Sequence, residues 1–418
     1  MTITSASLQT MQRLAATTRA GYSFDQEYYA SDAVFQADME QVIGQKWILA
    51  GHVSQVPKKG DYFLFRIGVE QIIVIRENAT SVRAFFNVCR HRGSTLCSAN
   101  SGNAPRLVCP YHAWTYGLDG KLIAARLMPD DFDKADNGLF ACHIRVFHGL
   151  IFINMSEGEP DDFDTTFGDM GPILDYHGIA DARIAHRGSY PTTANWKLVV
   201  ENFFECYHCV PSHPEFCSMH AAESIVAVGA GPSSGPADAV AGFMPKLHAW
   251  EASASALGRP IGNIDEPPTS SHLRLLMQRM NKDGFAAETQ DGTAPAPLMG
   301  KRSSADGGRM HLSFSPFSQI VADDHFAILF LFTPRATLQS DVEMIWLVDG
   351  RATQEQVDID KMIWGYHATT TQDKKITEDN QAGIMSSRYR PGRYSEQEGS
   401  VVNFQKWYLN QFGLDRAG

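Results

Sequence analysis

The sequence predicts an α+β protein with an antiparallel β domain in its N-terminal third and a larger C-terminal domain of antiparallel sheet with helices. Three observations predict this class: short β-type runs between 61 and 155, mixed helical and β-type segments after 160, and no internal repeat. We expect a helical segment over 1–47 that packs on the C-terminal domain, the β domain over 48–158 and the C-terminal domain over 159–418.

A helix-capping residue and runs of β-type residues predict the elements of the N-terminal part. Ser31 and Asp32 precede an amphipathic pattern that runs to Trp47, so a capped helix is predicted there. Four β-type runs come next: DYFLFRIG (61–68), QIIVIREN (71–78), VRAFFNVC (82–89) and HIRVFHGLIFINM (143–155).

The C-terminal part shows segments with the helical period of 3.6 residues and segments with the strand period of two. WKLVVENFFECYHC (196–209) is predicted to be helical until Pro211 stops it, and residues 353–384 are predicted to form one long helix. Residues 227–240 and 282–308 are rich in Gly, Ala, Ser and Pro, so mobile loops are expected. Three strands are predicted: HLSFSPFSQIV (311–321), HFAILFLF (325–332) and DVEMIWLV (341–348).

Composition excludes several classes of function. The net charge of −11 argues against binding to nucleic acid or anionic lipid, because no basic surplus exists to neutralise phosphates. The N-terminus has no signal-peptide core, and no stretch approaches the roughly 18–20 apolar residues of a membrane helix. We therefore expect a cytoplasmic protein whose seven cysteines are thiols or metal ligands rather than a disulfide framework.

Two Cys/His pairs indicate a metal centre in the β domain. Cys89-Arg-His91 and Cys109-Pro-Tyr-His112 are separated by 17 residues, and each ends a β-type run. Two such loops can meet tip to tip and offer two thiolates and two imidazoles, which is the ligand set of a Rieske 2Fe–2S cluster. The alternative is a structural zinc site, although a zinc finger would pair Cys with Cys and His with His.

The stretches CRHRGSTLC (89–97) and LVCPYHAWTYGLDGKL (107–122) resemble the cluster-binding signature of Rieske non-haem iron oxygenases, including Pro110 and Trp114 around the second histidine. The resemblance implies a Rieske-type 2Fe–2S cluster with four ligands: Cys89, His91, Cys109 and His112. Cys97 lies off this spacing and is expected to be a small packed residue.

A second constellation spans residues 205–213. Glu205 and His208 would share a helix face at spacing i, i+3, and His213 follows the Pro211 break, where a turn can fold it back. Two imidazoles and a carboxylate on one side of ferrous iron leave the other side open for O₂ and substrate. The segment resembles the E/D-x-x-H-x4-H motif of the same family, which implies that His208 and His213 bind iron and that Glu205 bridges to a cluster histidine of a neighbouring subunit.

The third iron ligand must be a carboxylate from elsewhere in the chain. In the predicted helix 353–384, one stripe collects Met362, Tyr366, Thr369, Asp373 and Ile376. Asp373 therefore faces inward, where an unpaired carboxylate is costly unless a metal binds it. The resemblance also places an Asp ligand in a C-terminal helix. Asp323 and Asp324, in a polar turn between predicted strands, are the alternatives.

Across most of its length the chain resembles the glycine betaine and stachydrine demethylase group of these oxygenases, although 227–308 matches poorly. The resemblance is carried by 196–209, TTQDKKITEDNQAGI (370–384) and YRPGRYSEQEGSVVNFQKWYLNQF (389–412). It implies the oxygenase (alpha) component of a two-component monooxygenase with a 2Fe–2S cluster and mononuclear Fe(II). Such an enzyme would hydroxylate an N-methyl group of a betaine-like quaternary ammonium compound and release formaldehyde, as a homotrimer with each cluster beside a neighbour's iron.

Electrons must come from a partner, because no G-x-G-x-x-G follows a strand and no plant-type ferredoxin spacing occurs. We expect a separate NAD(P)H-dependent flavin or ferredoxin-type reductase. The alternative substrate is an aromatic carboxylate or amine, hydroxylated on its ring. A Rieske electron carrier or metal-stabilised binding protein would require the 205–213 motif to be accidental.

A quaternary ammonium has no N–H to donate, so aromatic faces would be its natural site. Five aromatic residues are candidates for this site, and each of them is also interpreted as an ordinary residue of the hydrophobic core: Phe203, Phe204, Tyr207, Trp250 and Trp364. It singles out no Arg or Lys for a substrate carboxylate. Cys206 and Cys209 form a C-x-x-C pair that we expect to be packed thiols.

Overall fold

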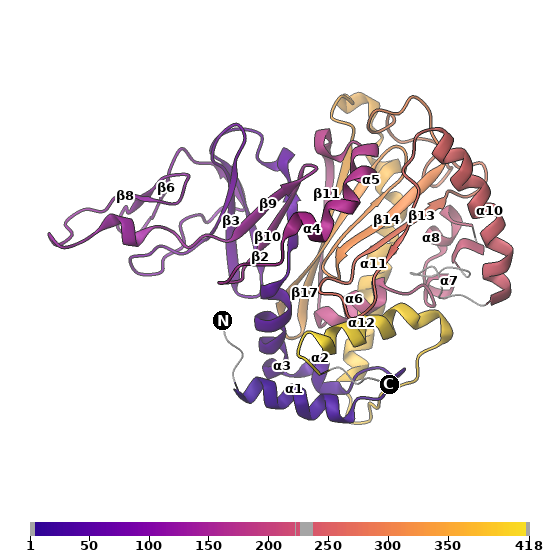
Figure 1. Ribbon diagram of the computed structural model, residues 1–418, viewed down its shortest axis with the longest axis horizontal. Helices are drawn as coiled ribbons and strands as arrows, with labels where there is room; N and C mark the ends of the chain where they lie inside the picture. Colours follow the sequence, from indigo (N-terminus) through magenta and orange to yellow (C-terminus); the bar gives the residue numbers. More distant parts are fainter. Residues whose placement is uncertain (1–4, 222, 226–236, 415–418) are drawn as a thin grey trace.

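Short antiparallel strands build the N-terminal β part, which projects from a larger α+β body (Figure 1). The computed structural model describes residues 5–221, 223–225 and 237–414. Within them, this part holds sheets of order β1-β10-β9, β4-β3-β2-β5 and β6-β7-β8. Its strands are β1 (Ile48–His52), β2 (Asp61–Ile67), β3 (Glu70–Arg76), β4 (Val82–Phe86), β5 (Ser101–Asn103), β6 (Leu107–Val108), β7 (Thr115–Tyr116), β8 (Leu122–Ala124), β9 (His143–Phe147) and β10 (Leu150–Asn154).

The run predicted over 143–155 is two strands instead of one. His148 and Gly149 have φ angles of 46° and 80°, and this left-handed backbone turns β9 directly back into β10. The alternation of the run hides the turn because the residues on both sides of it are apolar.

The body is built on one antiparallel sheet of order β11-β17-β16-β15-β14-β13-β12. β16 and β17 pair along nearly their whole length, and most of their side chains are buried. The strands are β11 (Arg183–Thr192), β12 (Ile264–Asp265), β13 (Leu275–Met280), β14 (Gly308–Ser315), β15 (Ser318–Ala322), β16 (Ala327–Ala336) and β17 (Gln339–Val348).

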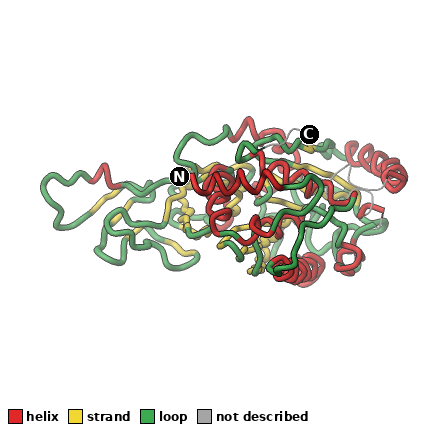
Figure 2. Tube along the Cα trace, turned by 90° about the horizontal axis from the view of Figure 1, so that it is seen from below, coloured by secondary structure: helices red, strands yellow, loops and turns green. Residues whose placement is uncertain are grey.

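Helices pack on this sheet and gather in the body (Figure 2), whereas the projecting part is strand and loop with two short 3-10 turns, η3 and η4. The long helix α11 packs against β11, α6 and α8. The body's helices are α4 (Phe163–Phe167), α5 (Gly171–Tyr176), α6 (Trp196–Phe203), α7 (Cys209–Ser212), α8 (Pro214–Met219), α10 (Ala237–Ala256), α11 (Ile359–Ile384) and α12 (Gly399–Asn410). The 3-10 turns are η3 (Val53–Gln55), η4 (Lys134–Asn137), η5 (Gly168–Met170), η6 (Ile179–Asp181), η7 (Gln354–Gln356) and η8 (Glu396–Glu398).

The N-terminal segment is helical in pieces: α1 (Ser5–Thr17), α2 (Gln26–Ala30), α3 (Asp32–Ala37), the π-turn η1 (Asp38–Val42) and the 3-10 turn η2 (Ile43–Gln45). Ser31 caps α3 as predicted, but the helix does not continue to Trp47. The chain changes its helical period at Asp38, whose carboxylate is fully buried and accepts from Trp196 Nε1 at 2.9 Å and from Lys197. The segment is thereby fixed to α6 in the body.

Two other expectations meet a different structure. The predicted helix 196–209 ends at Phe203, well before Pro211. Of the predicted loop 227–240, residues 227–236 lie outside the described residues, while 237–240 begin α10. Residues 282–307 are irregular, as predicted. Within the described ranges, no helix combines the length and the apolar character that crossing a lipid bilayer requires.

Candidate metal centres

Two loops of the projecting part present the Cys/His pairs in equivalent ways. Cys89 follows β4 and Cys109 follows β6. In each loop the amide four positions later donates to the cysteine carbonyl, Gly93 to Cys89 and Ala113 to Cys109, both at 3.0 Å. Gly93 and Ala113 also share a left-handed backbone, with φ of 75° and 59°. A left-handed alanine costs roughly 1 kcal/mol, which indicates that this loop shape is needed for more than stability.

The loops place sulfur inside and nitrogen outside. Cys89 and Cys109 are 2% and 3% exposed, and their thiols lie within hydrogen-bonding reach of each other. His91 and His112 are exposed, with ring centroids 4.7 Å apart. The hydroxyl of Tyr116 lies 3.3 Å from Cys89 Sγ, so a hydrogen bond reaches the sulfur from the protein interior.

This donor set fits a 2Fe–2S cluster better than a single ion. Among the described residues, three potential ligand atoms lie within 4.8 Å of one another only at a different site, so these four side chains are too widely spread for one zinc. A 2Fe–2S cluster would span that spread, and the two thiolates and the two imidazoles would hold it.

The second centre lies in the body, between the end of α6, the segment around α7, and α11. His213 Nε2 lies 2.9 Å from Asp373 Oδ1, and His208 Nε2 lies 3.3 Å from the same oxygen. The two imidazole rings are 4.9 Å apart and nearly perpendicular. The structure therefore brings together His208, His213 and Asp373, although Asp373 lies more than 150 positions away in the sequence.

A buried orphan pair shows that these groups fit a metal ion. His213 Nε2 and Asp373 Oδ1 are buried, and neither has a hydrogen-bond partner among the described residues despite their short separation. Together with an atom of His208, they lie within 4.8 Å of one another, which is close enough for all three to hold one ion. Two imidazoles and one carboxylate facing one point form the facial set that binds non-haem ferrous iron.

The outward nitrogens of both histidines are held in place. Glu205 Oε1 lies 2.5 Å from His208 Nδ1, and Gln372 Oε1 lies 2.9 Å from His213 Nδ1. An acceptor at Nδ1 keeps the proton there and leaves Nε2 free to bind a metal. Gln372, which sequence reasoning missed, precedes Asp373 on α11.

Glu205 and His208 do not share a helix, which corrects the i, i+3 argument. The chain leaves the helical conformation after Phe203 and turns before α7 begins at Cys209. Glu205 closes this turn by accepting from the main-chain N–H of Tyr207 and of His208, the latter at 3.2 Å. The Glu205 and His208 side chains therefore meet across a turn, and not along one face of a helix as the sequence predicted.

Glu205 and the Cys/His loops belong to different parts of the chain. β6 and β8 lie in the projecting part, whereas α6, α7 and α11 lie in the body (Figure 1). Glu205 and His208 also line a cavity of about 290 Å³.

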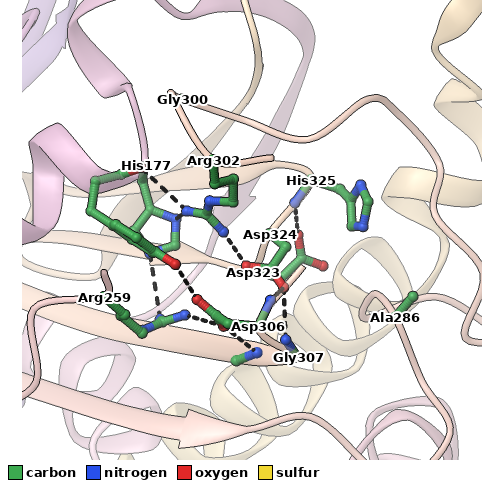
Figure 3. A network of polar contacts seen from close by, with 12 residues as sticks. His177, Arg259, Ala286, Gly300, Arg302, Asp306, Gly307, Asp323, Asp324 and His325 are labelled. Atoms are coloured by element: carbon green, nitrogen blue, oxygen red, sulfur yellow. Dashed lines mark hydrogen bonds and ion pairs between the residues drawn. The ribbon is translucent and has the colours of Figure 1, made fainter. Parts of the chain in front are cut away.

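Asp323 and Asp324 lie in the turn between β15 and β16, as predicted, but neither lines the cavity beside His208. Asp324 pairs with Arg302 and accepts from Gly307 N at 2.9 Å (Figure 3). Asp323 accepts from His325 N at 2.7 Å, and burial raises the pKa of Asp323 to about 7. Both carboxylates anchor loops at the end of the sheet.

A cavity of about 120 Å³ opens beside the three converging side chains. Of the five candidate aromatics, Phe203 lines it. Phe204 packs in the core on Phe404, Tyr207 is 58% exposed, and Trp250 donates to the Asp306 carbonyl. Trp364 on α11 is absent from its described lining.

The cavity is lined by side chains that the sequence did not single out. They come from α8, from the faces of β13 to β16 and from α11: Phe216, Met277, Arg279, Arg309, His311, Val321, Phe330 and Tyr366. The one local signal was an arginine inside the apolar run LLMQRM (275–280). Cys206 also lines the cavity beside Cys209, while Cys97 is buried, as a packed residue would be.

Comparison with known proteins gives two family matches. The model described as the ring hydroxylating alpha subunit (catalytic domain) matches residues 179–413, and that described as the Rieske 2Fe–2S domain matches residues 46–144.

Individual relatives extend these matches. The glycine betaine monooxygenase oxygenase subunit of Pseudomonas aeruginosa (strain UCBPP-PA14) is 36% identical over 412 residues, covering 95% of this chain and 91% of that protein. The carnitine monooxygenase oxygenase subunit of Acinetobacter baumannii (strain ATCC 19606) is 38% identical over 199 residues, covering 47% of this chain and 53% of that protein. The structure of the quaternary ammonium Rieske monooxygenase CntA with an inhibitor superposes with a TM-score of 0.71 at 24% identity, covering 96% and 98% of the two chains, and shows the same fold.

Proposed function

This chain belongs to the Rieske-type ring-hydroxylating oxygenases, and on that premise we propose that it is the oxygenase component of a two-component monooxygenase acting on betaine-like quaternary ammonium compounds. It would hydroxylate an N-methyl group and release formaldehyde. The observation that carries the proposal is the convergence of two imidazoles and a carboxylate on a partly aromatic cavity, in a chain similar to glycine betaine and carnitine monooxygenase subunits.

The residues are assigned as follows. The cluster ligands are Cys89, His91, Cys109 and His112, and the iron ligands are His208, His213 and Asp373. When bound, the cluster stores electrons singly and the iron activates O₂ for C–H hydroxylation. The protein's contribution is positional, because Glu205 and Gln372 fix the two imidazoles through their Nδ1 atoms.

The cavity favours an N-methyl cation beside the iron ligands. Phe203 and Phe330, with ring centroids 4.9 Å apart, present aromatic faces there, and a cation without N–H groups is stabilised by such faces. Hydroxylation of one methyl consumes O₂, two electrons and two protons, and yields water and an N-hydroxymethyl group. That group collapses as its C–N bond breaks, giving formaldehyde, a proton and the demethylated amine.

Electron delivery requires other chains. The Cys/His loops adjoin β4 and β6 of the projecting part, whereas the iron ligands adjoin α7 and α11 in the body (Figure 1). This separation supports transfer between subunits of a homotrimer, with Glu205 as the bridge to a neighbour's cluster histidine. The cavity of about 290 Å³ lined by Glu205 and His208 is the place for that contact. A separate NAD(P)H-dependent reductase would supply the electrons. None of the seven cysteines forms a disulfide, which fits the proposed cytoplasmic location.

The test uses purified holoenzyme with NADH and a ferredoxin-type reductase. Formaldehyde release and O₂ uptake are measured with glycine betaine, carnitine and, for the alternative function, benzoate. We expect formaldehyde in step with O₂ uptake for the betaines. His208→Ala should abolish release while the 2Fe–2S absorbance remains. A hydroxylated aromatic ring without formaldehyde would establish the alternative, and protein without acid-labile sulfide would contradict the cluster assignment.

A further inference from the structure

Two cysteines flank the iron ligand His208 in one tight turn. Cys206 and Cys209 stand on either side of Tyr207 and His208, and Cys209 N donates to the Cys206 carbonyl at 3.2 Å. A four-residue turn closed by such a bond keeps its end Cα atoms within roughly 7 Å of each other. Disulfides join cysteines whose Cα atoms are about 4.4–6.8 Å apart. The backbone is therefore already folded for a bond between these two residues.

The two sulfur atoms are also neighbours. The thiols of Cys206 and Cys209 lie within hydrogen-bonding reach of each other. Cys217, the third cysteine of the body, is engaged differently, because its Sγ donates to the Cys209 carbonyl at 3.5 Å. Closing a bond between Cys206 and Cys209 therefore requires a small movement of their sulfur atoms and no rearrangement of the chain outside the turn.

The pair faces the cavity beside the iron ligands. Cys206 and Cys209 both line this cavity, whereas Cys217 is absent from its described lining. Cys206 is half-buried and Cys209 is 4% exposed, so Cys206 is the more open of the two. A small oxidant that is released at the iron would meet the Cys206 thiol first. The sequence predicted two packed thiols, and the structure instead places both of them at the reaction space.

An oxygenase makes such an oxidant when O₂ takes up two electrons and two protons without hydroxylating a substrate, because the product is then hydrogen peroxide. The Cys206 thiol attacks one peroxide oxygen, the O–O bond breaks, an S–O bond forms and water leaves. The Cys209 thiol then displaces that oxygen as a second water, and the S–S bond forms. The two thiols lose two electrons and two protons in total, and one peroxide becomes two waters.

We propose that Cys206 and Cys209 form a reversible disulfide when peroxide is released in the iron cavity, and that this bond weakens iron binding through His208. Glu205, which directly precedes the pair, holds His208 Nδ1 at 2.5 Å and accepts from His208 N at 3.2 Å. Drawing the sulfur atoms together changes the turn that carries these contacts, so the imidazole loses its alignment with the other iron ligands. Disulfides of cytosolic proteins are usually transient and sensing bonds of this kind.

The oxidation is tested on purified protein that retains its cluster but lacks mononuclear iron. The protein is treated with hydrogen peroxide, the excess is removed with catalase, and free thiols are labelled with N-ethylmaleimide in denaturant. A protease that cuts after glutamate then releases the peptide Cys206–Glu215, which contains both thiols of the pair and excludes Cys217. Mass spectrometry reads this peptide as a labelled dithiol or as an unlabelled disulfide.

We expect the wild-type peptide to be a disulfide after peroxide and to accept both labels once a phosphine reductant is added first. Cys206→Ser and Cys209→Ser should lack the disulfide, and either variant decides if the other does not fold. Cys217→Ser, the matched control outside the cavity, should behave as wild type. Burial raises the pKa of Cys97 to about 11 and that of Cys142 to about 12, so both should remain labelled thiols. A wild-type peptide that stays a dithiol, or that becomes a sulfinic acid, would overturn the proposal.

Anaerobic calorimetric titration with Fe(II) measures the coupling to the iron site. Oxidation should raise the Kd of the wild type for Fe(II) by about tenfold, the effect of disturbing the partner of a metal-binding histidine. The same peroxide treatment should leave the Kd of Cys206→Ser at the value of the untreated variant. Linkage requires that bound Fe(II) opposes the disulfide by the same factor. Equal Kd values for the oxidised and reduced wild type would overturn the effect on iron.

The source of the oxidant is tested with NADH, O₂ and reductase but no substrate. Iron-loaded protein should form the disulfide and protein without mononuclear iron should not, and equal oxidation of the two would overturn the iron cavity as the source. Formaldehyde release decides the proposed function separately. If betaines are demethylated while the peptide stays reduced, only this inference fails. If no N-methyl compound is oxidised, a disulfide formed with added peroxide still upholds it.

Discussion

Replacing Glu205 with alanine tests how the iron site is held, because Glu205 makes the bond that fixes His208. Glu205 Oε1 lies 2.5 Å from His208 Nδ1, and the carboxylate also accepts from His208 N at 3.2 Å. Losing such a partner of a metal-binding histidine lowers metal affinity by about 10- to 100-fold, which corresponds to about 1.4–2.8 kcal/mol. We expect Glu205→Ala to fall in this range and Glu205→Gln to lose less, because the Gln carbonyl still accepts from Nδ1.

The assay is an anaerobic calorimetric titration of Fe(II) into protein that retains its cluster but lacks mononuclear iron. Glu343→Ala is the control, since it removes a partly exposed carboxylate on β17 that pairs with Arg187. Wild-type iron affinity in Glu205→Ala would refute the positioning argument. If turnover were nevertheless lost in that variant, the role of Glu205 would be electron delivery between subunits, as the bridge assignment has it.

Three further predictions concern the second histidine, the N-terminal segment and acid stability. Gln372→Leu removes the acceptor at His213 Nδ1 and should weaken Fe(II) binding by about tenfold. This is the low end of the range given for Glu205→Ala, because the lost partner is neutral. An unchanged Fe(II) affinity in the same titration would contradict the prediction. Lys197→Met strands the fully buried Asp38 carboxylate and should destabilise the protein by about 3–5 kcal/mol, measured by urea unfolding, where an unshifted midpoint would count against it. Burial lowers the pKa of His52 to about 4, from 6.5 when exposed, so the unfolded chain binds more protons between these values. The contribution of His52 to the free energy of unfolding is fully present above pH 6.5 and is lost as the pH falls towards 4, by about 1.4 kcal/mol per pH unit. His52→Gln should flatten this slope. Equal slopes in the variant and the wild type would show that His52 is not responsible.

The elements with a strong local period could be predicted from the sequence. α11 is the clearest case, since its apolar stripe put Asp373 on the inward face, and the structure has Asp373 Oδ1 2.9 Å from His213 Nε2. Predicting this position required only the period of one helix and the free-energy cost of burying an unpaired carboxylate. The predicted start at 353 was early, because Asp358 caps the helix and accepts from Lys361 N.

Elements without a single dominant period could not be predicted in this way. The segment after Phe203 contains no Gly or Pro before Pro211, yet it unwinds because the Glu205 carboxylate takes the main-chain N–H groups of Tyr207 and His208. This competition between a side chain and the helix is a local alternative that apolar spacing does not reveal. The interruption of the N-terminal helix at Asp38 has a different cause, a buried ion pair with Lys197 of α6.

The two ends of the iron cavity differ in how the sequence encodes them. His208 and His213 lie five positions apart, so one short segment that also contains Glu205 indicates a metal site. Arg279 and Arg309 lie thirty positions apart and meet only through the register of β13 and β14, where a slip of one residue would turn one of them to the other face of the sheet. Insertions in the irregular connection between these strands can therefore change this side of the cavity while the iron ligands stay in place. Chains that share the iron chemistry are then free to differ in substrate, and the β13–β14 pair, more than the metal motif, is the place to look for that difference.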